Sequence, residues 1–289
     1  MTKNKVLIFG ATGMAGHIVY YYLQNTGRYE VVNAVYRTKL TDDSIVVDVT
    51  DKDAVANLVR ETRSDLIINC IGVLIKGSKD HPDNAIFINA YFPHLLKKLA
   101  DEVGAKLIHV STDCVFSGKK GNYNESDFRD ADDIYGRSKA LGEIINDKDL
   151  TIRTSIIGPE LKLNGEGLFH WFMHQKGKVN GFTTAIWGGV TTLELAKAMD
   201  VAIVQQKTGL IQLSNGKGIT KYDLLNLFKK IWLRNDIEIL PFYGNGVDKS
   251  IAKSEKFLYE VPEYEEMLLE QYEWMKSHSH LYYQYPGIL

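Results

Sequence analysis

Short apolar runs alternate with amphipathic stretches along the first half of the chain. The runs are rich in β-branched residues, as in strands of a parallel sheet that is covered on both faces. They occupy residues 5–9, 30–36, 44–49, 65–70, 106–110 and 150–157. Helical periodicity follows three of them, at residues 17–23, 51–63 and 84–103. This strand-helix order predicts an α/β fold with a doubly wound parallel sheet and right-handed crossovers.

The strand-helix rhythm loosens after Gly158 and Pro159. We therefore expect a doubly wound domain at residues 1–158 and a smaller lobe at residues 159–289, some of whose segments return to the first domain. A ligand would bind in the crevice between the two parts. The lobe contains three helical stretches, at residues 168–174, 191–206 and 219–232.

The end of the chain, residues 277–289, is an aromatic tail with two histidines and three tyrosines. Aromatic side chains bury large apolar areas. We therefore expect the tail to dock on its own chain or on a partner subunit, and a homodimer is left open.

Composition excludes several classes of protein. Of the 289 residues, 45% are apolar and 24% are charged, and the net charge is -2, so neither nucleic acid nor an anionic membrane is expected as a partner. No apolar run approaches the ~18 residues of a membrane span, and the N-terminus leaves no room for a signal peptide. Cys70 and Cys114 match no disulfide framework and no zinc spacing, and the i, i+4 pair His170 and His174 lacks the glutamate of a metalloprotease motif. We expect a cytoplasmic protein without a metal site.

A glycine-rich turn joins the first strand to the first helix, in Gly10-Ala11-Thr12-Gly13-Met14-Ala15-Gly16. Such a turn lets the backbone approach a pyrophosphate at the N-terminus of a helix. A tight turn that binds nothing is the alternative, but the position between strand and helix favours a dinucleotide. The first domain is thus predicted to be a Rossmann-type NADP-binding domain. The expected contacts in this turn are Gly10, Thr12, Gly13, Met14 and Gly16.

The end of the second strand predicts which dinucleotide is bound. An acidic residue about twenty positions after the glycines would bind the ribose of NAD, but this chain has Tyr36-Arg37-Thr38-Lys39 there. A cation suits the additional phosphate of NADP, with Arg37 as the first candidate and Lys39 as a helper. NADP(H) is therefore preferred and NAD(H) stays an alternative, as does a solvent-facing Arg37 that binds nothing.

Other strand ends supply further cofactor contacts. Asp48 and Val49 follow the third strand and could lie beside an adenine, although Asp48 could equally be a capping or turn residue. The fourth strand ends in Cys70, Ile71 and Gly72, where a cofactor backbone would pass, and Cys70 has a packing role as its alternative. A loop is expected at residues 73–82. Asn89 in the next helix faces the interior, so its amide requires hydrogen-bond partners, and we include it among the cofactor contacts.

Tyr135 and Lys139 stand four residues apart in a stretch whose helical pattern continues to Ile145. On a helix these side chains lie on one face. A nearby cation favours the phenolate and lowers the pKa of a tyrosine, so that Tyr135 could exchange a proton with a substrate oxygen near neutral pH. By this spacing alone, the pair could also lie on a solvated helix face.

Together these motifs resemble the extended short-chain dehydrogenase/reductase superfamily, and in particular its dTDP-4-dehydrorhamnose reductase branch. The resemblance covers most of the chain to about residue 230. Within it, the segment Ser111-Thr112-Asp113-Cys114-Val115-Phe116-Ser117-Gly118 is more specific to this branch. The other matching segments are Gly10–Gly16, Tyr135–Lys139 with Gly142 and Glu143, Arg153–Ser155 and, more faintly, Gly188–Thr192 and Gly209–Gly216.

The resemblance implies an NAD(P)H-dependent reductase of a nucleotide-linked 4-keto-6-deoxy sugar, which serves cell-surface polysaccharide biosynthesis. It also implies a catalytic triad of Thr112, Tyr135 and Lys139. Tyr135 would give its proton to the carbonyl oxygen, and Thr112 would hydrogen-bond the same oxygen. Lys139 would bind the nicotinamide ribose and lower the tyrosine pKa, and the nicotinamide would supply a hydride.

At two positions that would lie near the sugar, this chain has other residues than the branch. Cys114 replaces a tyrosine and Ile156 replaces a tryptophan, both at positions that the resemblance places near the substrate together with Val73 and Val190. The sugar itself is therefore left open. A UDP-2-acetamido-4-keto-sugar reductase or an epimerase is an alternative, and so is a non-catalytic regulatory subunit that resembles the methionine adenosyltransferase β subunit.

Overall fold

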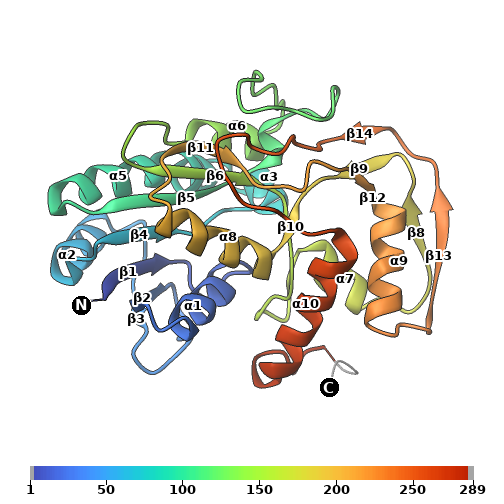
Figure 1. The fold of residues 1–289 in the computed structure, drawn as a ribbon, viewed down its shortest axis with the longest axis horizontal. Coiled ribbons are helices and arrows are strands. Elements are labelled where there is room, and N and C mark those ends of the chain that lie inside the picture. The colour runs from blue at the N-terminus through green and yellow to red at the C-terminus, as the bar shows by residue number, and fades with distance from the viewer. Residues whose placement is uncertain (1–2, 286–289) are drawn as a thin grey trace.

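The computed structural model describes residues 3–285, and its centre is a seven-stranded sheet in which every neighbouring pair is parallel (Figure 1). The strand order is β11-β6-β5-β4-β1-β2-β3, which confirms the predicted doubly wound α/β fold. The strands are β1 (Asn4–Phe9), β2 (Tyr29–Val35), β3 (Ile45–Val46), β4 (Leu66–Asn69), β5 (Lys106–Thr112), β6 (Leu150–Thr154) and β11 (Gly209–Gln212).

Helices cover both faces of this sheet. Along β1, Val6 and Ile8 belong to one apolar cluster, and Leu7 and Phe9 belong to another, because successive side chains of a strand point to opposite faces. The first cluster includes α1 (Gly16–Asn25) and α8 (Thr192–Val204), and the second includes α2 (Lys52–Thr62) and α5 (Phe92–Val103). The sheet is thus buried on both sides, as its apolar strands predict.

The helix predicted at residues 84–103 is broken into three parts, which are α4 (Pro82–Ala85), the π-helical turn η1 (Ile86–Tyr91) and α5. Pro93 has no N–H group to donate to the carbonyl of Asn89. That carbonyl is closely approached by Gly142, where an added Cβ would lie 1.9 Å from the oxygen. The irregular turn therefore serves close packing against the end of α6 (Ile134–Leu141).

Two further predictions about local structure are wrong. Residues 73–82, predicted to be a loop, contain α3 (Ile75–Asp80). The helix that carries Tyr135 ends at Leu141, with Gly142 as its C-cap, so the apolar residues 144 and 145 lie outside it. In both places the packing against neighbouring elements outweighs the local apolar pattern.

The second half of the chain is built from small sheets and helices, with α8 and β11 returning to the central sheet (Figure 1). Three small sheets pair β7 with β10, β8 with β13, and β9 with β12 and β14. Their strands are β7 (Ile156–Ile157), β8 (Gly177–Phe182), β9 (Ala185–Trp187), β10 (Val190–Thr191), β12 (Ile219–Thr220), β13 (Ile237–Phe242) and β14 (Val247–Asp248). The helices are α7 (Leu168–Met173), α9 (Lys221–Ile231) and α10 (Tyr264–Ser277), with short 3₁₀ turns η2 (Asp113–Val115) and η3 (Ser279–Leu281). Within residues 3–285, no helix combines the length and apolarity needed to cross a membrane.

Candidate active site

Two cavities lie at the carboxyl edge of the central sheet. The first, of about 360 Å³, is lined by Thr112, Tyr135 and Lys139. The second, of about 540 Å³, extends over the ends of β2 and β3. Both are lined by Thr12 and Gly13 of the glycine turn and by residues 70–72. The cavities are therefore adjacent, and the glycine turn lies between them.

The glycine turn is closed by short backbone contacts. The Gly13 N–H donates to the Gly10 carbonyl oxygen at 2.9 Å, and Gly10 has a φ of +81°, a conformation that favours glycine. A Cβ added to Gly16 would lie 2.1 Å from that same oxygen, so no other residue fits at this position. Thr12, Gly13 and Met14 line the first cavity, Gly10 lines the second, and Gly16 is buried behind the turn. The turn thus has the bare backbone that a pyrophosphate requires.

The second cavity is lined by both buried and exposed residues, and Tyr36 and Asp48 are among the exposed ones. The Arg37 guanidinium stacks on the Tyr36 ring, with Cζ 4.5 Å from the ring centroid, and its Nη2 donates to the Tyr36 hydroxyl at 2.9 Å. Asp48 and Val49 line the cavity. Hydrogen bonds from the Thr50 N–H and hydroxyl lower the pKa of Asp48, so Asp48 is both a turn residue and part of the cavity wall. Lys39 lies apart from these residues and donates to the Asp42 carbonyl at 2.9 Å.

The wall between the two cavities is formed by residues 70–73. Burial raises the pKa of the Cys70 thiol to about 12, which keeps it protonated and unreactive. Asn89 is fully buried behind this wall. Its amide oxygen accepts from the Val73 N–H at 2.8 Å, and its amide nitrogen donates to the Val73 carbonyl at 3.0 Å and to the Ser138 hydroxyl at 3.1 Å. The structure therefore gives Asn89 protein partners, and it supports the wall rather than lining either cavity.

Thr112 and Tyr135 come together in the first cavity from the end of β5 and the first turn of α6. The Thr112 hydroxyl donates to Asp113 Oδ1 and accepts from the Cys114 N–H, both at 3.1 Å. Burial raises the pKa of Tyr135 far above its usual value, and the neighbouring Cys114 raises it further, while a hydrogen bond with Thr112 lowers it. The prediction of a lowered tyrosine pKa is therefore wrong for the protein alone.

Burial of both Tyr135 and Lys139 explains why the tyrosine pKa is not lowered. The Lys139 ammonium donates to the Val110 carbonyl at 2.7 Å, and burial lowers the pKa of Lys139 to about 8, against the raising effect of the Glu143 carboxylate. A buried phenolate would lose its hydration, and this cost exceeds the benefit of one nearby cation. Tyr135 accordingly keeps its proton at neutral pH.

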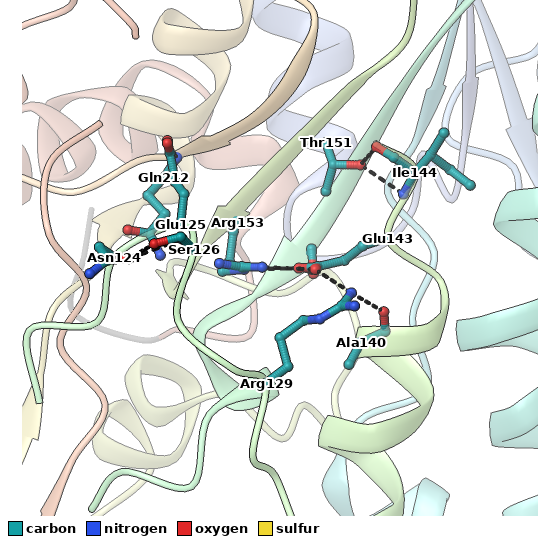
Figure 2. A network of polar contacts seen from close by, with 11 residues as sticks. Asn124, Glu125, Ser126, Arg129, Ala140, Glu143, Ile144, Thr151, Arg153 and Gln212 are labelled. Carbon is teal, nitrogen blue, oxygen red and sulfur yellow. Dashed lines mark hydrogen bonds and ion pairs between the residues drawn. The ribbon is translucent and has the colours of Figure 1, made fainter. Parts of the chain in front are cut away.

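A buried ion pair lies one turn beyond Lys139 (Figure 2). The Glu143 carboxylate accepts from Arg153 Nε and Nη2 at 2.9 and 2.8 Å, from the Ser111 hydroxyl at 2.8 Å and from Arg129 at 3.0 Å. Burial opposes the charge of Glu143, but the Arg153 hydrogen bonds hold its pKa below the usual range. The sequence motifs include Glu143 and Arg153 but predict no role for them. For Glu143, the spacing of four residues from Lys139 indicated a position near the site.

The four predicted substrate residues are separated by the structure. Cys114 and Ile156 line the first cavity beside Tyr135. Val73 lines the second cavity, and Val190 is fully buried and pairs with Ile156 across β7 and β10. The first cavity therefore brings together the two positions at which the chain departs from the resemblance.

Residues 160–167 form one side of the first cavity, and the sequence analysis missed them. Lys162 lines both cavities, and Glu160 and Gly167 line the first. A cation three residues after Pro159 was the available signal. His170 and His174 contact each other through their rings, with centroids 4.3 Å apart. In the part of the chain that the structure describes, no three His, Cys, Asp or Glu side chains gather as a metal site would require.

The chain is similar to a known protein family and to several proteins with names. The family described as RmlD substrate binding domain matches residues 4–178. A probable low-salt glycan biosynthesis reductase of Haloferax volcanii is 34% identical over 158 residues, which are 52% of each chain. A dTDP-4-dehydrorhamnose reductase of Aggregatibacter actinomycetemcomitans is 32% identical over 157 residues, 52% of this chain and 51% of that protein. The methionine adenosyltransferase 2 subunit beta of Bos taurus is 31% identical over 142 residues, 49% of this chain and 42% of that protein.

These matches span about half of the length of the curated relatives, or somewhat less. Solved structures extend the similarity over most of the fold. A hypothetical dTDP-4-dehydrorhamnose reductase from Sulfolobus tokodaii superposes with a TM-score of 0.76 at 25% identity, over 90% of this chain and 98% of that one. A dTDP-4-dehydrorhamnose reductase from Bacillus anthracis in complex with NADP shares the fold with a TM-score of 0.79 at 23% identity, over 94% and 99%.

Proposed function

The chain belongs to the RmlD substrate binding domain family, and on that premise we propose that it is an NAD(P)H-dependent reductase of a nucleotide-linked 4-keto-6-deoxy sugar. Membership confirms the resemblance found in the sequence motifs. The observation that carries the proposal is the meeting of Thr112, Tyr135 and Lys139 in one cavity, next to the glycine turn. The proposed setting, cell-surface polysaccharide biosynthesis, is supported by the curated relative that is named as a glycan biosynthesis reductase.

The residues at the carboxyl edge of the sheet fit a dinucleotide. The glycine turn presents its backbone to the two cavities, and Gly16 lets the turn pack closely, because a Cβ there would lie 2.1 Å from the Gly10 carbonyl oxygen. Cys70, Ile71 and Gly72 would lie along the cofactor between the two cavities, and Asp48 and Val49 would lie beside its adenine. Bound NAD(P)H supplies a hydride to the carbonyl carbon.

Tyr135 supplies the proton in this proposal. Its buried phenol stays protonated at neutral pH, which is the state that a general acid needs. The Thr112 hydroxyl lies beside it and orients the substrate oxygen. The Lys139 ammonium, one helical turn away, faces the same cavity and stabilises the phenolate that forms when the proton leaves.

We propose NADPH as the preferred cofactor. Arg37 follows Tyr36, which lines the second cavity, and its guanidinium is held against the Tyr36 ring. A guanidinium recognises a phosphate through paired hydrogen bonds. The NADP in the Bacillus anthracis structure is consistent with this choice. NAD(H) stays the alternative, because Arg37 is exposed and solvent screens its charge.

The sugar is proposed only as a class. Cys114 and Ile156 leave more room beside Tyr135 than the aromatic residues of the branch would, so the cavity suits a sugar with a substituent larger than hydroxyl. A UDP-2-acetamido-4-keto sugar carries such a substituent and is therefore kept as the alternative to a dTDP-linked deoxysugar. Epimerisation with the same triad is the further alternative.

Turnover by the purified protein tests the proposal. The protein is incubated with NADPH or NADH and each of a panel of 4-keto nucleotide sugars, and oxidation of the cofactor is followed by its absorbance. We expect oxidation with at least one sugar and none without sugar. Product stereochemistry by NMR then separates a reductase from an epimerase. Absence of oxidation across the panel would contradict the reductase function.

A second candidate function has a specific observation in its favour, the similarity to the methionine adenosyltransferase 2 subunit beta. In that case the chain would bind and regulate another enzyme. Affinity purification of the tagged chain, with the wild type and Tyr135→Phe compared in cells, tests this candidate. A stoichiometric enzyme partner together with full function of Tyr135→Phe would favour it over the reductase.

A further inference from the structure

The C-terminal tail lies against the active site, far in sequence from the residues that it contacts. Tyr282 and Tyr285 are each 1% exposed, whereas Tyr283 between them is 72% exposed. The tail thus docks on its own chain, which was one of the two expectations for it. Residues 286–289 of the tail lie outside the described part of the chain. The tail also lies beyond residues 4–178, the region that the family model matches.

Tyr285 holds one end of the segment at residues 160–167, here called the bridging loop. Its hydroxyl accepts from the Glu160 N–H at 2.9 Å and lies 2.8 Å from His170 Nδ1. Gln284 adds a hydrogen bond from its amide to the Glu160 carbonyl. The other end is tied back by Glu160 itself, because its carboxylate accepts from the Gly167 N–H at 2.6 Å. Both ends of the loop are therefore fixed through Glu160 and the tail.

The bridging loop places a cation where the two cavities meet. Lys162 is exposed and lines both of them. The loop also lies close to the glycine turn, since a Cβ added to Gly167 would be 3.3 Å from Met14 Cε. A nucleotide bound across the glycine turn brings its diphosphate to this place. An ammonium here can form a charge-assisted hydrogen bond to a phosphate oxygen.

Tyr282 gives the tail a second contact, on the glycine turn itself. His17 is fully buried, and burial lowers its pKa to about 4, so the ring is neutral and has one donor and one acceptor nitrogen. Nδ1 faces the Gly13 carbonyl at 2.8 Å and therefore carries the proton. Nε2 is left to accept from the Tyr282 hydroxyl at 2.9 Å. One tail thus fixes both the glycine turn and the bridging loop.

We propose that Lys162 binds a diphosphate oxygen of the bound nucleotide, and that Tyr285 is a positioning residue that sets Lys162 through Glu160. The inference rests on the proposed function to the extent that a nucleotide occupies these cavities. The diphosphate is that of the dinucleotide cofactor or that of the sugar nucleotide, since Lys162 lines both cavities. Tyr282 is likewise a positioning residue, which sets Gly13 of the glycine turn through His17.

The dissociation constant for NADPH, measured by fluorescence titration of the full chain without any sugar, tests the inference. Lys162→Gln should weaken NADPH about tenfold, the loss of one charge-assisted hydrogen bond, and Lys162→Arg should restore most of it. Tyr285→Phe should weaken NADPH several-fold, and Tyr285→Phe combined with Lys162→Gln should weaken it no more than Lys162→Gln alone. Tyr283→Phe is the matched control and should leave the constant unchanged.

The outcomes distinguish the diphosphate of the cofactor from that of the sugar nucleotide. They also distinguish a failure of this inference from a failure of the proposed function. An unchanged NADPH constant with a raised KM for the nucleotide sugar in Lys162→Gln assigns the contact to the sugar nucleotide and supports the inference. The inference is overturned if Lys162→Gln changes neither the NADPH dissociation constant nor the KM for the nucleotide sugar. It is also overturned if the losses of NADPH affinity in the two single variants add fully in the double variant. Thermal melting shows whether Tyr285→Phe lowers the stability of the protein. Lys162 is exposed, so the Lys162 variants still test binding if it does. A wild type that binds neither NADPH nor NADH contradicts the proposed function instead.

Discussion

Two tyrosines illustrate the difference between the two cavities. Tyr135 in the first cavity is 9% exposed, and Tyr36 at the second is 52% exposed. Each has a cation nearby, Lys139 for the one and Arg37 for the other. Lys139 is buried and its ammonium is held by a backbone carbonyl, whereas Arg37 lies in solvent on the ring of its neighbour. A tyrosine with a neighbouring cation thus has two different environments in two adjacent cavities.

We expect the buried residues Tyr135 and Lys139 to take part in catalysis, and the exposed Arg37 to take part in cofactor recognition. In the first cavity, desolvation raises the pKa of the buried Tyr135 and lowers the pKa of the buried Lys139, and the Glu143–Arg153 ion pair lies behind them. At the exposed Arg37, solvent and salt screen the charge, so that this residue contributes modestly to binding. Substitutions in the first cavity should therefore have large effects, and those at the second should have small ones. Four predictions test that contrast, from the largest expected effect to the smallest.

Tyr135→Phe should lower kcat by about 10²–10⁴-fold, because it removes the proton donor. The NADPH dissociation constant should stay the same, since the phenyl ring keeps the shape of the site. Steady-state kinetics with an active sugar, beside a binding titration, measure both. Tyr243→Phe, at a tyrosine that is 80% exposed, is the control. Retained activity would remove the catalytic role assigned to Tyr135.

Glu143→Gln should lower the free energy of unfolding by about 3 kcal/mol, because it leaves the Arg153 charge buried without a counter-charge. The two side chains are 0% and 1% exposed. Urea denaturation of both proteins measures the change. Glu265→Gln breaks the exposed pair with Lys230, whose side chains are 45% and 66% exposed, and should cost less than about 1 kcal/mol. Equal losses in the two variants would contradict the contrast between buried and exposed charges.

The pH dependence of kcat/KM should have an alkaline limb set by Lys139. Burial lowers the pKa of this lysine to about 8. Below that pH the ammonium is charged and can assist Tyr135, and above it the charge is lost, so activity should fall about tenfold by one pH unit beyond the pKa. In Glu143→Gln the limb should move to lower pH, because the Glu143 carboxylate raises this pKa. A limb that stays in place in Lys139→Arg would assign it to another group.

Arg37→Asp should weaken NADPH about five- to tenfold relative to NADH, because it replaces an exposed cation with an anion. Titration of both cofactors gives the ratio. Lys39→Asp is the matched control, since the Lys39 ammonium lies on the Asp42 carbonyl, and it should change the ratio less. Equal losses of NADPH and NADH in Arg37→Asp would remove the role of Arg37 in cofactor choice.

Several features of the fold and the site could be predicted from the sequence because they depend on neighbours in the chain. The apolar runs identified six of the seven strands of the central sheet, although β11 was missed among the segments after Pro159. The glycine turn, and the common face of Tyr135 and Lys139, follow from spacing within one turn or one helix. The small sheets of the lobe were not predicted, because strands of two or three residues carry too little pattern.

Sequence alone therefore determined the doubly wound sheet, the glycine turn and the common helix face of Tyr135 and Lys139. Tertiary structure alone decided the protonation of that pair, because desolvation depends on everything packed around a group. It also decided the partners of Asn89, the burial of Glu143 with Arg153, and the position of Lys162. The contacts of the tail join residues 125 and 265 positions apart, from Glu160 to Tyr285 and from His17 to Tyr282. No local pattern contains such contacts, since only the folded chain brings these residues together.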